Sequence, residues 1–281
     1  RKMRTLVDAT KTIGRGNLGD PQLQTITSKD ELGDLARAFD QMRTELQKAQ
    51  NKAIHSERLS MIGQMASSIV HDFRTPMSTI NLAVESLQGG MNFTPEKTQE
   101  WYRMIRDAVQ RMVTMAQELL DFSRGDVRLE KVEFPLPEFT CLLIRSIKPN
   151  LEQANIKLKV EERYSGTALF DPDRLQRAMI NIINNAQDAM PSGGTLNIAT
   201  GREDGCLLVS ISDTGKGIPL EIKETIFDAF VTAGKKKGTG LGLAITKRII
   251  DQHSGEIVVE SEPGKGTKFI IKIPLGDCLD N

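Results

Sequence analysis

The 281-residue chain lacks several features that would place it at once in a common class of protein. It has only three cysteines (Cys141, Cys206 and Cys278) and no Cys-x-x-Cys pair, so neither a zinc site nor a disulfide framework is expected. Its 37 basic and 37 acidic side chains cancel, which gives no indication of nucleic-acid binding. No apolar run approaches the ~20 residues of a membrane span, and no signal peptide is visible. The cysteine usage fits a reducing cytoplasm, and a length of 281 residues is enough for two or three modules.

A change of pattern near Ser123–Asp126 divides the chain. Residues 1–125 are helical in pattern, whereas strands and helices alternate from about residue 130 onward. In the helical part, apolar residues recur at spacings of three and four along one segment that begins after Asp30-Glu31, as in the seam of a coiled coil. The members of this seam are Leu32, Leu35, Phe39, Met42, Leu46, Ala49 and Ala53. The seam leads into a helix around Ser60–Leu87 that carries His71.

A third helix follows a turn over residues 89–95. Its apolar residues, again three and four apart, are Trp101, Ile105, Ala108, Met112, Met115, Leu119 and Phe122. Two helices joined by a short turn predict an antiparallel hairpin. One hairpin leaves apolar surface uncovered, so the simplest expectation is a homodimer with a four-helix bundle. The alternative is a monomer whose apolar stripe packs on the C-terminal part.

His71 faces away from the apolar stripe of its own predicted helix. At about 100° per residue, it lies roughly 180° from Ile62, the first member of the stripe. The remaining members are Ala66, Ile69, Phe73, Met77, Ile80, Val84 and Leu87. A lone surface histidine is usually just solvated. An exposed imidazole beside Asp72, with Thr75 and Pro76 following, is also a nucleophile that a partner can reach.

The C-terminal part predicts one α/β sandwich. Its expected helices are 136–153, 172–190 and 241–253, and Asp171 before Pro172 is a typical N-cap. His253 ends the last helix, where a positive charge suits the helix dipole. The expected strands are 131–133, 157–161, 168–170, 195–200, 206–212, 256–261 and 268–273.

Four segments of this part have a composition suited to a nucleotide. One of them is 227–230 (Phe-Asp-Ala-Phe), which precedes a loop, 231–237, whose three consecutive lysines would screen the repulsion between phosphates. Asn181, Asn184, Asn185 and Asp188 share one helix face, which suits Mg²⁺ and phosphate-side hydrogen bonds, although an ordinary polar face is the simpler reading. The segment 213–219 (Asp-Thr-Gly-Lys-Gly-Ile-Pro) directly follows a predicted strand. The segment 238–243 (Gly-Thr-Gly-Leu-Gly-Leu) opens a helix, whose N–H groups form an anion site. The glycine-rich segment 238–243 is a weak signal alone and the segment 213–219 a moderate one, and the order of the segments makes the set specific.

Together these segments resemble a bacterial two-component sensor histidine kinase. The run His71-Asp72-Phe73-Arg74-Thr75-Pro76 resembles the family's phospho-acceptor box, with Asp72 where many relatives have Glu. Residues 181–185, 213–217, 227–230 and 238–242 resemble its nucleotide-binding boxes in order. The resemblance implies a multidomain chain: a HAMP signal-relay coiled coil (1–51), a dimerisation and histidine-phosphotransfer hairpin (52–125) and an ATP-binding α/β sandwich of the GHKL (Bergerat) type (130–276).

The resemblance also implies a site and a reaction. His71 would accept the γ-phosphoryl group of ATP, Asp72 would orient the imidazole, and Thr75 would align a water that dephosphorylates a response regulator. Asn185 would hold Mg²⁺ with help from Asn181, and Asp213 would bind adenine. The other nucleotide-contacting residues would be Asp188, Gly215, Lys216, Gly217, Ile218, Phe230, Lys235, Lys236, Lys237, Gly238, Thr239, Gly240, Leu241, Gly242 and Thr267.

The implied partners are a second copy of the chain and the receiver domain of a response regulator, with no nucleic acid. Because the chain begins with Arg1 rather than Met, we expect a part of a longer protein. The resemblance implies that this part is the cytoplasmic portion of an inner-membrane protein. Phosphorylation within or between subunits stays open. Two rivals also remain: an ATPase of the chaperone or topoisomerase type, which leaves His71 without a purpose, and a relay scaffold with a vestigial ATP site.

Overall fold

The computed structural model describes residues 31–88, 94–124, 129–232 and 239–275. The chain divides into two compact units, residues 1–65 and 66–281. In the first unit the described element is helix α2 (Glu31–Gln64). Leu35, Met42 and Leu46 of the predicted seam are exposed on it, so they are available to a second helix. None of the described helices is apolar over a length that would cross a bilayer.

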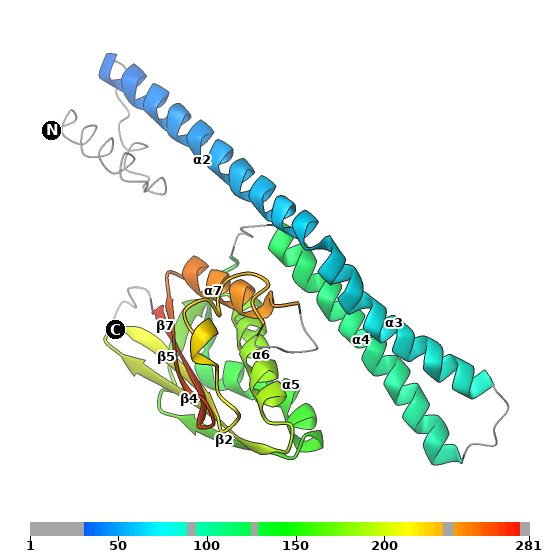
Figure 1. Ribbon diagram of the computed structural model, residues 1–281. Helices are drawn as coiled ribbons and strands as arrows, with labels where there is room; N and C mark the ends of the chain where they lie inside the picture. The colour runs from blue at the N-terminus through cyan, green and yellow to red at the C-terminus, as the bar shows by residue number, and fades with distance from the viewer. Residues whose placement is uncertain (1–30, 89–93, 125–128, 233–238, 276–281) are drawn as a thin grey trace. The chain divides into compact units, whose positions relative to one another are not determined.

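The second unit begins with two antiparallel helices, α3 (Ala66–Gln88) and α4 (Pro95–Arg124), which lie side by side (Figure 1). The predicted stripe of α4 is confirmed, because none of its seven members is exposed, and Ala108 and Phe122 are buried. The predicted hairpin is therefore present. Its turn at residues 89–93 lies outside the described residues.

The predicted stripe of α3 is wrong in part. Ala66, Met77 and Val84 are exposed, whereas Pro76 and Ala83 are buried. The buried residues extend the row of Ile69, Phe73 and Ile80, and the small side chain of Ala83 suits a close approach of the two helix backbones. Met77 and Val84 instead belong to a second apolar row on another face of the helix.

The α/β part has a mixed five-stranded sheet in the order β2-β4-β5-β7-β6. Its strands are β2 (Ile156–Glu162), β4 (Gly194–Glu203), β5 (Cys206–Asp213), β6 (Glu256–Glu262) and β7 (Gly266–Pro274). Only the β2–β4 pair in this sheet is parallel. Strands β1 (Val132–Pro135) and β3 (Thr167–Phe170) form a separate antiparallel pair.

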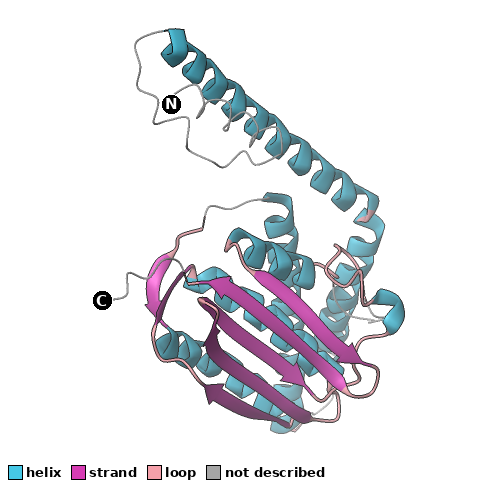
Figure 2. Ribbon diagram, turned by 90° about the vertical axis from the view of Figure 1, so that its left-hand side faces the viewer, coloured by secondary structure: helices cyan, strands magenta, loops and turns pink. Residues whose placement is uncertain are grey.

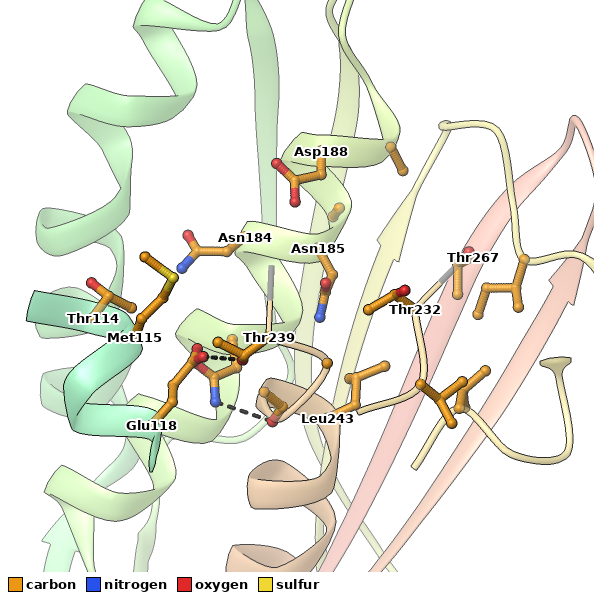
Figure 3. Close-up of a pocket in the computed structure, with 18 of the residues that line it drawn as sticks. Thr114, Met115, Glu118, Asn184, Asn185, Asp188, Thr232, Thr239, Leu243 and Thr267 are labelled. Carbon is orange, nitrogen blue, oxygen red and sulfur yellow. Dashed lines mark hydrogen bonds between the residues drawn. The ribbon is translucent and has the colours of Figure 1, made fainter. Parts of the chain in front are cut away.

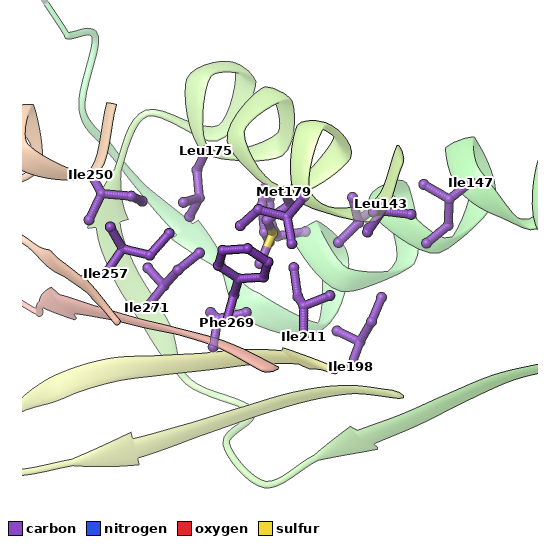
Figure 4. Packing of buried hydrophobic residues seen from close by; sticks show 14 of the residues in the cluster. Leu143, Ile147, Leu175, Met179, Ile198, Ile211, Ile250, Ile257, Phe269 and Ile271 are labelled. Carbon is purple, nitrogen blue, oxygen red and sulfur yellow. The ribbon is translucent and has the colours of Figure 1, made fainter. Parts of the chain in front are cut away.

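Helices α5 (Leu136–Gln153), α6 (Pro172–Ala189) and α7 (Gly242–Gln252) cover one face of the five-stranded sheet (Figure 2). Burial alternates along β5, as period-two strand geometry requires. Side chains such as Ile211 and Phe269 from the strands pack against Leu175 and Met179 from α6 (Figure 4). The predicted α/β sandwich is confirmed, with one helical layer and one sheet layer.

The first turn of α6 is fixed by Asp171. Its carboxylate accepts the N–H of Arg174 at 3.1 Å, as predicted for an N-cap, and also the N–H of Glu130 at 2.9 Å. Its own N–H donates to Nε2 of His253 at 3.0 Å. A polar side chain thus ties the start of α6 to the end of α7.

His253 differs from the expectation of a cation at the end of α7. The residue is 2% exposed, and its Nδ1 lies 2.7 Å from the carbonyl oxygen of Ile249. Burial lowers the pKa of His253 below its ordinary value. Since Nε2 accepts a hydrogen bond, the ring is neutral, and its role is to hold two helix ends together.

Candidate functional site

A cavity of about 540 Å³ opens among the polar face of α6, the carboxyl end of β5 and the start of α7 (Figure 3). Side chains of α3 and α4 also line it. This volume lies within the range of small-molecule sites in proteins. The cavity brings together segments that are far apart in the sequence, and each segment contributes a different kind of group.

Helix α6 contributes amides and one carboxylate. Its apolar face, which includes Met179, Ile182 and Ile183, is buried in the core, so its opposite face turns to the cavity. Asn181, Asn184, Asn185 and Asp188 all line the cavity from this face. The Nδ2 of Asn181 donates to the carbonyl oxygen of Gly242 at 3.2 Å, which joins α6 to the start of α7.

Asp213 ends β5 at the floor of the cavity and is 8% exposed. Its Oδ1 accepts the N–H of Gly215 at 2.8 Å. Burial raises the pKa of the Asp213 carboxyl, and hydrogen bonds from the N–H groups of Gly215 and Thr267 oppose the rise. A desolvated acceptor of this kind suits a ligand that brings its own N–H donors, as an exocyclic amine does.

Gly217 allows the chain to turn beside Asp213. Its φ is +70°, and a Cβ there would lie 2.2 Å from the carbonyl oxygen of Glu262. A larger residue would be strained and would also displace neighbouring backbone. Lys216, Gly217 and Ile218 all line the cavity, as the sequence predicts for a segment that approaches a flat ring.

The start of α7 faces the cavity through Thr239, Gly240 and Gly242. Gly240 has a φ of +70° and its added Cβ would meet the backbone of Phe230 at 2.6–2.9 Å. The N–H of Leu241 donates to Oγ1 of Thr239 at 3.2 Å. Free N–H groups at a helix start and the helix dipole together suit an anion such as phosphate.

The phospho-acceptor segment reaches the same cavity in part. Asp72, Thr75 and Pro76 of α3 line it, but His71 does not. The side chain of His71 is 76% exposed, and its Nδ1 lies 3.5 Å from Oδ1 of Asp72. The prediction that His71 points away from the helix packing is therefore confirmed, and its imidazole is beside the carboxylate expected to orient it.

Other predicted site residues lie elsewhere or are not described. Gly215 and the buried Leu241 do not line the cavity, although residues adjacent to them in the sequence do. Thr267 lines it. Phe230 instead packs its ring on that of Phe122 of α4, with centroids 5.6 Å apart. Lys235, Lys236, Lys237 and Gly238 lie outside the described residues.

Helix α4 supplies lining residues that the sequence patterns did not indicate. Gln110, Arg111, Thr114, Met115 and Glu118 all face the cavity. Glu118 accepts a hydrogen bond from the hydroxyl of Thr239. The sequence does contain a pattern that could have indicated Glu118. It follows Met115 by three residues and precedes Phe122 by four, so an acidic side chain lies on the packed face of α4.

The donor set fits a magnesium ion that is held mainly by a nucleotide. Among the described residues, no cluster of three or more His, Cys, Asp or Glu side chains could hold a metal alone. Mg²⁺ bound with a nucleotide needs only one or two protein oxygens, because phosphates and waters fill the rest of its octahedron. Asn185 and Asp188 offer an amide and a carboxylate oxygen on one wall of the cavity.

Three protein families match consecutive parts of the chain. Residues 1–48 match the HAMP domain, and residues 61–128 match the His Kinase A (phospho-acceptor) domain. Residues 170–277 match the Histidine kinase-, DNA gyrase B-, and HSP90-like ATPase family. The last match contains all the cavity segments from α6 to β7.

Relatives cover most of this chain. Sporulation kinase A of Bacillus subtilis (strain 168) is 32% identical over 236 residues, which are 82% of this chain and 38% of that protein. Sensor histidine kinase YclK of the same strain is 28% identical over 285 residues, which are 98% of this chain and 59% of that protein. The chain thus spans less than two thirds of the length of each of these two relatives.

Among solved structures, histidine kinase ThkA in complex with response regulator protein TrrA is 29% identical to this chain. The TM-score is 0.66, over 82% of this chain and 67% of the matched one. Its likeness covers helical and α/β parts alike. With HAMP, phospho-acceptor and ATPase matches in order and kinase relatives along the whole chain, this protein belongs to the family of two-component sensor histidine kinases.

Proposed function

We propose that this chain is a protein-histidine kinase that transfers the γ-phosphoryl group of ATP to His71 and then passes it to an aspartate of a response regulator. One observation carries the proposal. The cavity that holds the asparagine face of α6, Asp213 and the start of α7 is also lined by Asp72 and Thr75 of the phospho-acceptor helix. The cavity that we assign to the nucleotide is therefore also lined by the helix that carries the acceptor.

The chemistry of His71 follows from its carboxylate neighbour. Nδ1 lies 3.5 Å from Oδ1 of Asp72, and this carboxylate would favour the tautomer that carries its proton on Nδ1, which leaves the lone pair of Nε2 to attack. As the Nε2–P bond forms, the bond from Pγ to the bridging oxygen breaks and ADP leaves with that electron pair. Asp72 accepts the Nδ1 proton from the resulting imidazolium, which leaves a neutral phosphohistidine ring.

The cavity residues position the nucleotide for this transfer. Asp213 would accept a hydrogen bond from the exocyclic amine of adenine, and the start of α7 would bind phosphate oxygens. Asn185, with Asn181, would hold Mg²⁺, which would neutralise phosphate charge. Phosphoryl transfer depends mainly on positioning and on neutralisation of charge. The ATPase part therefore needs only to bind and orient the nucleotide, and the nucleophile comes from the helical hairpin.

We assign the response regulator as partner and substrate from the chemistry of phosphohistidine, which transfers readily to a carboxylate. The complex of ThkA with TrrA supports this assignment by likeness. Thr75 lines the cavity one turn after His71 and would align a water for dephosphorylation of the regulator. Thr75→Ala should slow loss of phosphate from a phosphorylated cognate regulator. An unchanged rate contradicts this role.

The assembly and setting follow from the same family likeness. We infer a homodimer, because the hairpin leaves apolar rows exposed on α3 and α4. The HAMP match and the likeness to sensor kinases such as YclK support a protein that is linked to a membrane and signals on its cytoplasmic side. Size-exclusion chromatography with light scattering tests the dimer, and fractionation of cells that express the full-length protein tests the membrane link.

Labelling with γ-phosphate-labelled ATP tests the kinase proposal. We expect label on the protein that is lost in acid and kept in alkali, as for a phosphoramidate. His71→Gln should reduce it to background. His55→Gln, which changes an exposed histidine on α2, is the matched control and should keep the label.

Two further outcomes decide between this proposal and its rivals. Persistence of label in His71→Gln would mean that another residue is the acceptor. Release of free phosphate with no labelled protein would favour an ATPase that uses hydrolysis for conformational work. Asn185→Ala should weaken ATP binding in Mg²⁺ while the melting temperature is kept, and an unchanged affinity would contradict its place at the metal.

A further inference from the structure

Glu118 is a carboxyl group on a helix face that otherwise packs. Met115 and Phe122, three residues before it and four residues after it, are half-buried and buried. Burial raises the pKa of the Glu118 carboxyl, whereas the Thr239 hydrogen bond and the charge of Arg177 oppose the rise. Desolvating a carboxyl group costs free energy unless it is hydrogen-bonded. The partner of Glu118 therefore indicates what this position does.

That partner is the threonine at the start of the phosphate-facing segment. The hydroxyl of Thr239 donates to Oε2 of Glu118 at 2.5 Å (Figure 3). The same hydroxyl oxygen accepts the N–H of Leu241 at 3.2 Å. A threonine hydroxyl has a single proton. That proton is committed to Glu118, so it is not available to a phosphate oxygen at the start of α7.

The charge of Glu118 also opposes binding of a phosphate group near Thr239. Glu118, Thr239, Gly240 and Gly242 line one cavity. A carboxylate and a triphosphate in one partly desolvated cavity repel each other. Both effects mean that the contact between α4 and Thr239 is weaker when a nucleotide occupies the cavity.

The next turn of α4 makes further contacts with the ATPase domain. Asp121 forms an ion pair with Arg177 of α6, and its carbonyl oxygen accepts from Arg248 of α7 at 2.6 Å. The ring of Phe122 packs on Phe230. In this docked arrangement the cavity is lined by Asp72 and Thr75 but not by His71 of the same chain. In this arrangement the imidazole of that histidine is therefore not at the cavity.

We propose that Glu118 is a positioning residue that ties Thr239 to α4, so that docking of the hairpin and binding of a nucleotide triphosphate oppose each other. The proposal rests on the assignment of the cavity as the ATP site. Because coupling between two binding events is reciprocal, docking lowers nucleotide affinity by the same factor by which the nucleotide weakens docking. ATP would thereby release the hairpin from its resting contact.

Calorimetric titration of the whole chain with ATP and Mg²⁺ tests this coupling. The background carries His71→Gln, so that binding is measured without phosphorylation. Glu118→Gln removes the charge but keeps an acceptor, and we expect it to tighten ATP binding. Glu118→Ala removes both and should tighten it more, by at least about fivefold, the lower end of usual couplings. Glu100→Gln, an exposed acid on the same helix, is the matched control and should have no effect.

A double-mutant cycle separates the hydrogen bond from charge alone. In a Thr239→Val background the hydroxyl is gone, so Glu118→Ala should tighten binding by less than in its presence. In the chain with His71 intact, Glu118→Gln should lower KM for ATP without lowering kcat. A merely structural role would raise KM or lower both.

Three results overturn the proposal. Unchanged affinity in both Glu118 variants, at an unchanged melting temperature, would show that no coupling exists. Weaker ATP binding would place Glu118 among residues that support the nucleotide. An equal gain in the Thr239→Val background would remove the hydroxyl from the argument. If affinity rises as expected while the unmutated chain forms no phosphohistidine, the coupling stands and the kinase proposal fails.

Discussion

At the scale of single residues, His253 carries a pH-dependent part of the stability. Its neutral ring accepts from Asp171 and contacts the carbonyl of Ile249, and burial lowers its pKa below the ordinary value of 6.5. Between the folded and unfolded pKa values the unfolded chain binds more protons, so stability rises with pH in that window. The contribution is complete above about 6.5 and is lost as pH falls through the folded pKa.

Urea unfolding measured from pH 7.5 down to pH 5 checks this prediction. We expect the free energy of unfolding to fall with pH in the unmutated chain. His253→Gln should be less stable at pH 7.5 by about 1–3 kcal/mol, because buried partners lose a hydrogen bond. It should also show a flatter pH dependence. His55→Gln is the control and should keep the pH dependence of the unmutated chain. If this variant had an equally flat profile, the pH dependence would not be due to His253.

The roles of residues could be predicted from the sequence where a helix face has an unusual set of side chains. They were missed where the role depends on tertiary packing. Amides in place of Lys and Glu on α6 indicated Asn181 and Asn185 by composition alone, and both line the cavity. Spacing alone placed His71 outward. Nothing local tells that Phe230 packs on Phe122 or that Glu118 meets Thr239, because those partners are more than 100 residues apart in sequence.

At the scale of elements, α6 depends on one cap. Asp171 accepts from Arg174 and Glu130, and it is buried. Asp171→Ala should lower the free energy of unfolding by about 2–3 kcal/mol, more than an exposed cap, since a second N–H also loses its acceptor. Asp171→Asn keeps one acceptor and should lose less. Denaturant midpoints of the two variants measure the difference, and equal losses would contradict the two-acceptor account.

Element bounds were predictable to within about two residues wherever a strong local signal ends the element. The cap Asp171 and the turn Pro191–Gly194 mark α6, and the predicted helix 136–153 matches α5. Strands were predicted short at their ends, since β4 continues to Glu203, where side chains are exposed and the alternation carries no signal. The α3 stripe was misassigned because both Met77 and Pro76 have helical spacing, and only packing on α4 selects Pro76.

At the scale of the whole molecule, the hairpin has more apolar surface than its own packing uses. Exposed apolar side chains recur at heptad spacing on α3 at Val70, Met77 and Val84. Another row on α4 comprises Tyr102, Val109, Val113 and Leu120. Rows with this period are what a bundle of four helices buries. A second hairpin from another copy of the chain would supply two such helices.

Val113→Glu tests this assembly. The side chain is 56% exposed in the single chain, so the substitution should be tolerated in a monomer, whereas an unpaired carboxylate at a dimer interface costs several kcal/mol, on the order of the full stability of a weak dimer. We expect light scattering to give twice 31.1 kDa for the unmutated chain and 31.1 kDa for the variant. Val258→Glu, on β6 and 42% exposed, is the matched control and should remain dimeric. A variant that keeps the dimer mass at low micromolar concentration would place the interface elsewhere, and then the exposed rows of α3 and α4 would need another occupant.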